Sequence, residues 1–96
     1  MNFKIAGTKY YNNDYRVGSK ITLEHDPSNV HDSNAIKVLN EDGDQLGHVP
    51  AAAAAVMMLL SQRADLSIAE LFYATADYDD SFSMDLLPNL QVVERS

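Results

Sequence analysis

Residues 26–38 decide the fold and read Asp26-Pro27-Ser28-Asn29-Val30-His31-Asp32-Ser33-Asn34-Ala35-Ile36-Lys37-Val38. A loop of short polar side chains runs directly into an apolar strand, which we expect over residues 35–39. Loop Asn and Asp side chains hydrogen-bond nearby backbone and hold irregular turns rigid. A rigid polar loop at a strand end is a good place for a binding site, but the same pattern is typical of a braced turn that binds nothing. The loop alone leaves both interpretations open.

A hairpin and a helix follow this stretch. Residues 41–44 contain Asp-Gly, which tolerates the positive φ of a tight turn, and residues 45–49 form the returning strand. Pro50 suits the first position of a helix that runs through Ala51 to about residue 62, because five consecutive alanines have high helix propensity. We expect its apolar side chains to be buried, and these are Val56, Met57, Met58, Leu59 and Leu60.

The remaining apolar patterns predict further strands. Period-two alternation indicates strands over residues 3–5, 20–24 and 82–86, and a last edge strand over 90–93 is possible from the pattern. The segment 65–78 carries two signals. Its residues 67–70 form a capping box, which favours a helix, whereas residues 71–75 are β-prone. The chain is therefore a small β-rich domain with one good helix, a compact barrel or half-barrel.

Length and composition limit the class of protein. The 96 residues allow one domain, covering 1–96, and 46% hydrophobic with 22% charged residues is ordinary for a globular chain. There is no cysteine, which excludes disulfides, thiolate zinc sites and a cysteine nucleophile. The longest largely apolar run, 49–60, is too short to cross a bilayer, and the apolar run at the N-terminus is too short for a signal peptide. We expect no membrane partner, and a cytoplasmic location, or a nuclear one in a eukaryote.

The charge bears directly on partners. The formal net charge is -7, whereas phosphate contacts give most nucleic-acid binders a basic surface. Broad duplex binding is therefore disfavoured, while a small site for one strand end is not. Basic residues lie mostly in the N-terminal half, and acidic residues gather at 41–44 and 77–85. The molecule is expected to have two electrostatic faces.

The order of these signals resembles the HIRAN domain family. The resemblance rests on Lys9-Tyr10-Tyr11, Gly18, the run from residue 23 to 38, and Gly47-His48-Val49-Pro50. It covers residues 3–60 well and continues through 79–84 with a looser match. Such domains are accessory modules of helicase-like DNA translocases and also small standalone proteins. The resemblance implies a mainly β, OB-like barrel with one or two helices, and it favours a strand over residues 71–76.

The resemblance also implies a DNA site that captures the 3′ end of single-stranded DNA. Tyr10 and Tyr11 correspond to an aromatic pair beside the DNA, Asp32 to the acceptor of the 3′-hydroxyl, and His48 to a phosphate or sugar contact. The full set of implied site residues is Lys9, Tyr10, Tyr11, Asn29, His31, Asp32, His48 and Phe82, with Phe82 stacking on a base and Lys20 and Lys37 assisting. An aromatic side chain can stack on any base, so this contact does not depend on the DNA sequence. An ionised Asp accepts a hydrogen bond from a hydroxyl group but repels a phosphate.

Three departures from the family favour an alternative. His31 replaces a larger aromatic, Pro50-Ala51-Ala52 replaces a basic helix start, and the chain is acidic. The alternative function is an acidic interaction module that binds a basic protein partner, such as a nuclease or helicase. Nothing in the sequence has the order of a catalytic constellation, a cofactor box or a metal site, so we expect no enzyme, no cofactor and no metal. A start at Met1 favours a standalone protein.

Overall fold

The computed structural model describes residues 1–87. Six strands, two α-helices and one 3-10 helix follow one another in the order β1 (Asn2–Lys4), η1 (Thr8–Tyr10), β2 (Lys20–His25), β3 (Ile36–Leu39), β4 (Gln45–His48), α1 (Ala51–Ala64), α2 (Ile68–Leu71), β5 (Phe72–Asp77) and β6 (Ser81–Leu86). The strand bounds agree with the alternation patterns to within one or two residues. The possible edge strand over residues 90–93 lies outside the described residues.

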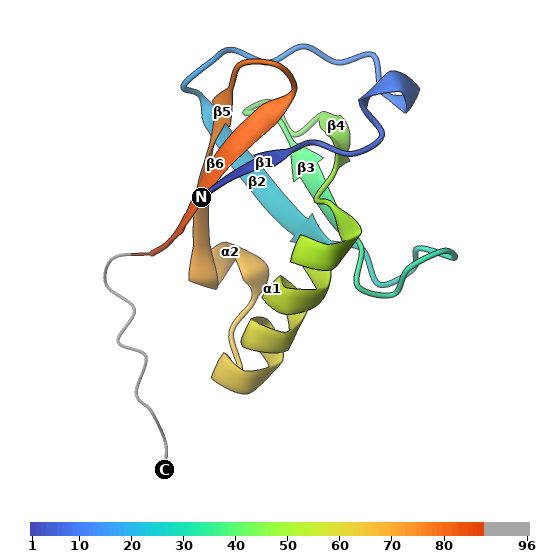
Figure 1. The fold of residues 1–96 in the computed structure, drawn as a ribbon, viewed down its shortest axis with the longest axis vertical. Coiled ribbons are helices and arrows are strands. Elements are labelled where there is room, and N and C mark those ends of the chain that lie inside the picture. Colours follow the sequence, from blue (N-terminus) through green and yellow to red (C-terminus); the bar gives the residue numbers. More distant parts are fainter. Residues whose placement is uncertain (88–96) are drawn as a thin grey trace.

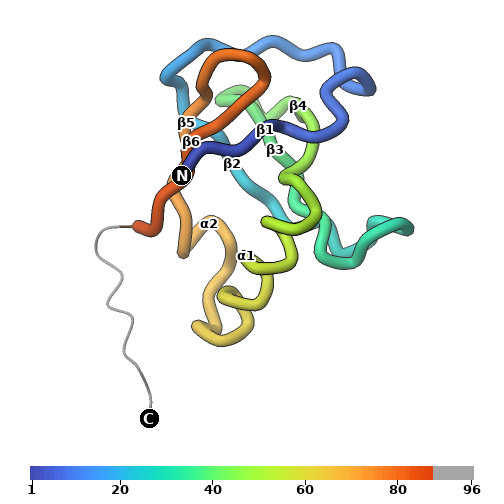
Figure 2. Tube along the Cα trace, viewed as in Figure 1, coloured from blue at the N-terminus to red at the C-terminus, as the bar shows by residue number. Residues whose placement is uncertain are grey.

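The strands form one curled antiparallel sheet in the order β1-β6-β5-β2-β3-β4 (Figure 1). Its two edges meet at a single β-bridge between Ala6, just after β1, and His48 in β4. The result is a half-barrel closed at one point, which confirms the predicted mainly β, barrel-like class. Both helices lie together at one end of the sheet, below the strands in the view (Figure 2).

The core fills the inner face of the sheet and the space under the helices. Alternate residues of β2 and β3 point inward, among them Ile21, Leu23, Ile36 and Val38. The helices add Ala54, Met57, Met58, Ile68 and Leu71 to the same cluster. Because sheet residues alternate between faces, the outer face carries mostly polar side chains that are exposed or half-buried. No helix in the described part of the chain is long and apolar enough to cross a membrane.

Helix α1 buries a different face from the one expected. Pro50 is the N-cap residue with extended backbone, and Ala54, Met57 and Met58 are the buried side chains. Val56, Leu59 and Leu60 are 58%, 47% and 43% exposed, so their predicted burial is wrong. A continuous apolar run does not by itself define one helical face. In the folded protein the helix instead buries the small side chain of Ala54 and the flexible side chains of Met57 and Met58.

The ambiguous segment 65–78 follows both of its signals in turn. Ser67 caps the short helix α2 in a complete capping box: the Glu70 N–H donates to Ser67 Oγ, and the Ser67 N–H donates to Glu70 Oε1 at 3.1 Å. The chain then becomes β5 at Phe72. The strand favoured by the HIRAN resemblance is therefore confirmed, and the capping box begins a helix of one turn before it.

Candidate nucleic-acid interface

A close backbone contact builds the first part of the site. The Ala6 N–H donates to His48 O at 2.7 Å, and the His48 N–H donates to Ala6 O at 2.9 Å. Gly47 makes this approach possible, because a Cβ at that position would collide with Ala6 O and the Ile5 side chain. The contact leads the chain from β1 directly past β4 into η1. The Gly47-His48 pair is therefore explained by the fold: Gly47 lets the backbone of Ala6 approach, and His48 forms the bridge with Ala6.

The two tyrosines predicted at the site have different surroundings. Gly7, with φ 73, begins η1 in the left-handed region. Tyr10 is 76% exposed, with Lys9 Nζ 5.1 Å from its ring centroid. Tyr11 is half-buried and packs edge-on against the His48 ring, with ring centroids 6.0 Å apart and planes at 64°. The Tyr10 ring thus lies largely in solvent with Lys9 beside it, whereas the Tyr11 ring is held against His48.

His48 lies in a row of polar side chains on the outer face of the sheet. Its cross-strand neighbour is Lys37, and Lys37 in turn pairs with Glu24. The Gln45 amide nitrogen lies 3.4 Å from His48 Nε2 and also donates to Gly47 O. The Gln45 amide can donate to Nε2 when the ring proton of His48 is on Nδ1. The histidine is therefore positioned by Tyr11 on one side and Gln45 on the other.

The polar loop is braced by the residues predicted for it. Asn29 Oδ1 accepts from the N–H groups of His31 and Asp32 at 2.9 and 3.1 Å. Asp32 Oδ1 accepts from the Asn34 N–H at 2.9 Å. The side chains of Asn29 and Asp32 therefore brace the loop, and Asn34 takes part through its backbone N–H. Within residues 1–87 the second carboxylate oxygen of Asp32 accepts no hydrogen bond, so bracing and ligand binding are compatible in one side chain.

The loop base and His48 lie at the same end of the sheet. The Asp26 N–H donates to Ala35 O and closes the loop. Ala35 is two residues before Lys37, the strand partner of His48. In Figure 1 the loop after β2 and the helical turn η1 both project from the right of the molecule, with β4 between them. The fold thus places Tyr11 beside His48, and the loop that carries Asn29, His31 and Asp32 begins and ends at the same end of the sheet as His48.

Phe82 is the clear correction to the predicted site. Its side chain is fully buried and packs on Phe3, with ring centroids 5.7 Å apart. Along β6 it points inward opposite Ala76, whose small side chain leaves room for the ring. Both ring faces are covered, so Phe82 belongs to the core and cannot stack on a base in this fold. Lys20 is also remote, because it lies four residues, roughly 13 Å, along β2 from the Glu24–Lys37–His48 row.

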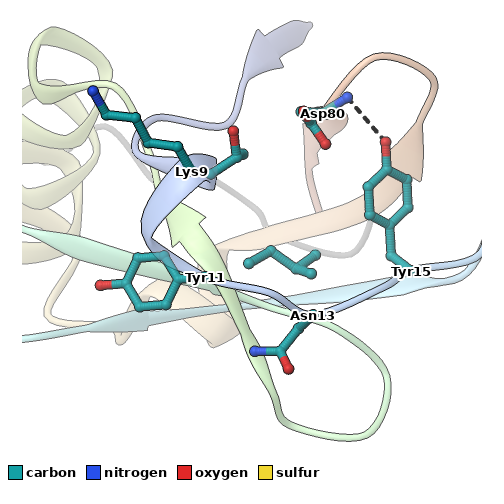
Figure 3. Close-up of a pocket in the computed structure, with 7 residues that line it drawn as sticks. Lys9, Tyr11, Asn13, Tyr15 and Asp80 are labelled. Atoms are coloured by element: carbon teal, nitrogen blue, oxygen red, sulfur yellow. Dashed lines mark hydrogen bonds between the residues drawn. The ribbon is translucent and has the colours of Figure 1, made fainter.

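A pocket beside the predicted site was not foreseen. It has a volume of about 280 Å³ and is lined by Thr8, Lys9, Tyr11, Asn13, Tyr15, Leu46 and Asp80 (Figure 3). The Asp80 N–H donates to Tyr15 Oη at 2.9 Å, and Asn13 Nδ2 donates to Gln45 O at 2.7 Å. Tyr11 therefore contacts His48 and also lines this pocket. The polar turn at 12–14 was the only sequence signal, and nothing in the sequence linked Tyr15 to the distant Asp80.

Proteins with a similar sequence include helicase-like transcription factors. The chain is 38% identical to mouse helicase-like transcription factor over 61 residues, 60% of the chain and 6% of that protein. It is 40% identical to the human protein over 45 residues, 47% of the chain. The chain thus spans only about 4–6% of these relatives' length.

Among solved structures, the HIRAN domain of human HLTF superposes with a TM-score of 0.74 at 23% identity. The match covers 88% of this chain and 71% of that one, and it shows a shared fold. The profile of the HIRAN domain matches residues 1–90. With the profile covering nearly the whole chain, the protein belongs to the HIRAN domain family.

Proposed function

We propose that this domain is a non-catalytic module that captures the 3′-hydroxyl end of single-stranded DNA. HIRAN domains are DNA-binding modules of HLTF-like proteins. The observation that supports the finer proposal is the hydrogen bonding of the two carboxylate oxygens of Asp32. One of its oxygens is held by the Asn34 N–H, and the other is without a partner among residues 1–87. In this role the domain would serve a helicase, nuclease or repair complex.

The carboxylate supplies the discrimination between strand ends. An ionised Asp only accepts hydrogen bonds, so its open oxygen suits the O–H of a free 3′ end. A 3′-phosphate or a continuing strand would place negative charge at the same oxygen and be repelled. Because Asn29 and Asn34 hold the backbone and one carboxylate oxygen, the open oxygen is presented without loss of side-chain freedom on binding.

The neighbouring residues supply affinity that does not depend on sequence. The exposed ring of Tyr10 is available to stack on a base, a contact worth about 1–3 kcal/mol. His31 is exposed beside Asp32 and offers a second, smaller ring. Lys9, Lys37 and His48 contribute donors for phosphate or sugar oxygens. The small number of cations fits the capture of a strand end rather than a long backbone track.

The test is fluorescence anisotropy with short single strands that end in a 3′-hydroxyl, a 3′-phosphate or a blocked sugar, at low and moderate salt. Asp32→Asn keeps an oxygen for the Asn34 N–H but removes the charge, so the preference for the hydroxyl end should disappear. Asp42→Asn makes the same charge change in the exposed 41–44 turn and should leave the preference intact. Equal binding of hydroxyl and phosphate ends by the unmodified protein would overturn the proposal.

A second candidate function follows from the acidic hairpin between β5 and β6. Asp79 and Asp80 are both exposed there, and Pro50, Ala51 and Ala52 place no cation at the start of α1. Such a surface suits a basic protein partner, such as a nuclease or helicase, better than a phosphate chain. If no strand binds at low salt, co-purification with a basic partner that is lost when Asp79 and Asp80 become Ser would support this candidate. Co-purification that survives both changes would count against it.

A further inference from the structure

The pocket between η1 and the β5–β6 hairpin has the properties of a subsite for a single planar ring. Its volume of about 280 Å³ lies just below the usual range for small-molecule sites, roughly 300–1,000 Å³, so it suits one ring system rather than a larger ligand. Tyr11 and Tyr15 stand on opposite sides of it (Figure 3), and Leu46 adds an apolar lining. Aromatic side chains beside polar groups are typical of sites that stack a base and hydrogen-bond its edge.

The polar groups of the pocket indicate which ring it would hold. The ammonium group of Lys9 lies over the Tyr10 ring. The Lys9 side chain therefore extends away from Tyr15 (Figure 3). Among the lining residues, Asp80 is the charged residue on the Tyr15 side of the pocket (Figure 3). The Tyr15 oxygen already accepts from the Asp80 N–H, so its own hydroxyl hydrogen remains available to donate. A ring with an amino group to donate to the carboxylate, next to an acceptor for the tyrosine hydroxyl, satisfies both.

We propose that this pocket binds an amino-bearing nucleobase of one of the three nucleotides that precede the captured 3′-terminal one. The inference rests on the proposed function, because Tyr11 joins the two parts of the site: its edge contacts His48, and the same ring lines the pocket. Cytosine, adenine and guanine carry an exocyclic amine that an Asp accepts from, whereas thymine presents two carbonyl oxygens around its N–H. The carboxylate therefore disfavours thymine.

The test uses 3′-hydroxyl oligonucleotides of thymidine in which one nucleotide is replaced by cytidine, adenosine or an abasic residue. The replacement is moved through the three nucleotides that precede the terminal one. At one position the unmodified protein should bind cytidine or adenosine about fivefold more tightly than thymidine, and an abasic residue more weakly than an amino-bearing base. Equal affinities at all three positions would overturn the proposal.

Asp80→Asn is the informative variant, with Asp79→Asn as its matched control. Both residues are exposed in the same hairpin with φ of 51° and 59°, a conformation that Asn adopts readily, so both variants should fold. Both changes remove one negative charge, but only Asp80 lines the pocket. The preference over thymidine should fall to less than about twofold in Asp80→Asn and persist in Asp79→Asn. Equal loss in both variants would assign the effect to general charge and reject the pocket.

The same titrations separate the two proposals. If the preference for a 3′-hydroxyl over a 3′-phosphate persists while base identity has no effect, the end-capture function stands and the base pocket is rejected. If neither preference is found, both are rejected. The Leu46 methyl signals provide an independent measurement: in NMR spectra they should shift on addition of the cytidine-containing strand more than with the all-thymidine strand.

Discussion

Ala6 and His48 exchange both of their backbone hydrogen bonds, and this one bridge joins the two edges of the sheet. It also delivers the turn η1, and with it Tyr11, to the ring of His48. The seam of the half-barrel and the centre of the candidate interface are therefore the same contact. Changes that open the seam should reduce both stability and DNA affinity.

Gly47→Ala should open that seam. The added Cβ would overlap Ala6 O and the Ile5 side chain, and forced overlap in a packed region costs about 1–3 kcal/mol. Gly43→Ala is the control, because its φ of 85° is also unfavourable for alanine but a Cβ there meets open space. Urea unfolding should show the larger loss for Gly47→Ala, which alone should weaken single-strand binding. Equal effects of the two changes would contradict the role of the seam.

Asn29→Ala should loosen the loop without unfolding the domain. The change removes the acceptor of the His31 and Asp32 N–H groups, each hydrogen bond being worth about 0.5–1.5 kcal/mol. Hydrogen exchange of these two amides should accelerate, and the preference for a 3′-hydroxyl end should diminish. Ser33→Ala, at an exposed position in the same loop, should leave both properties unchanged. Unaltered exchange in Asn29→Ala would show that the loop is held by other contacts.

Tyr10→Ala should weaken single-strand binding and leave stability nearly unchanged. Its ring is mostly exposed, and the loss of one stacked base corresponds to about 1–3 kcal/mol of binding free energy. Tyr73→Ala removes another exposed tyrosine, on β5 away from η1, and controls for the general loss of an aromatic surface. Anisotropy titrations compare the two variants. A similar loss of affinity in both would place the stacking surface elsewhere.

The capping box at α2 predicts a defined pH dependence. The Ser67 side chain first, and then its backbone N–H, hydrogen-bond the Glu70 carboxylate and lower its pKa below the ordinary value. A lowered folded-state pKa contributes stability that is present above the unfolded-state pKa and is lost as pH falls through the lowered one. An NMR titration should find the pKa of Glu70 lower in the unmodified protein than in Ser67→Ala. Identical titration curves would argue that the box does not form in solution.

Two substitutions on α1 should separate its buried and exposed sides. Met57→Ala leaves a cavity in the core and should cost about 2–5 kcal/mol in unfolding free energy. Leu59→Ser changes a side chain that is nearly half exposed and should cost much less, about 1 kcal/mol. Denaturant unfolding measures both. Comparable losses of unfolding free energy in the two variants would show that Leu59 is buried, as the apolar run predicted.

Some features could be predicted because they depend on local pattern. The alternation in residues 20–24, the Asp42-Gly43 turn and the alanine run each act within a few residues of chain, and the structure follows all three. The bracing by Asn29 and Asp32 is likewise local, since short polar side chains reach backbone groups two or three residues away. The order of these motifs was also enough to indicate the HIRAN family.

The sequence by itself therefore determined the elements and the polar loop, whereas the tertiary structure decided which side chains face a ligand. Phe82 is in the core because β6 presents it to Phe3 and Ala76, a matter of strand pairing. The pocket joins Tyr15 to Asp80 across 65 positions of chain, and no local rule couples such distant residues. Contacts of this kind depend on register and closure of the sheet, which become defined only when the whole core packs.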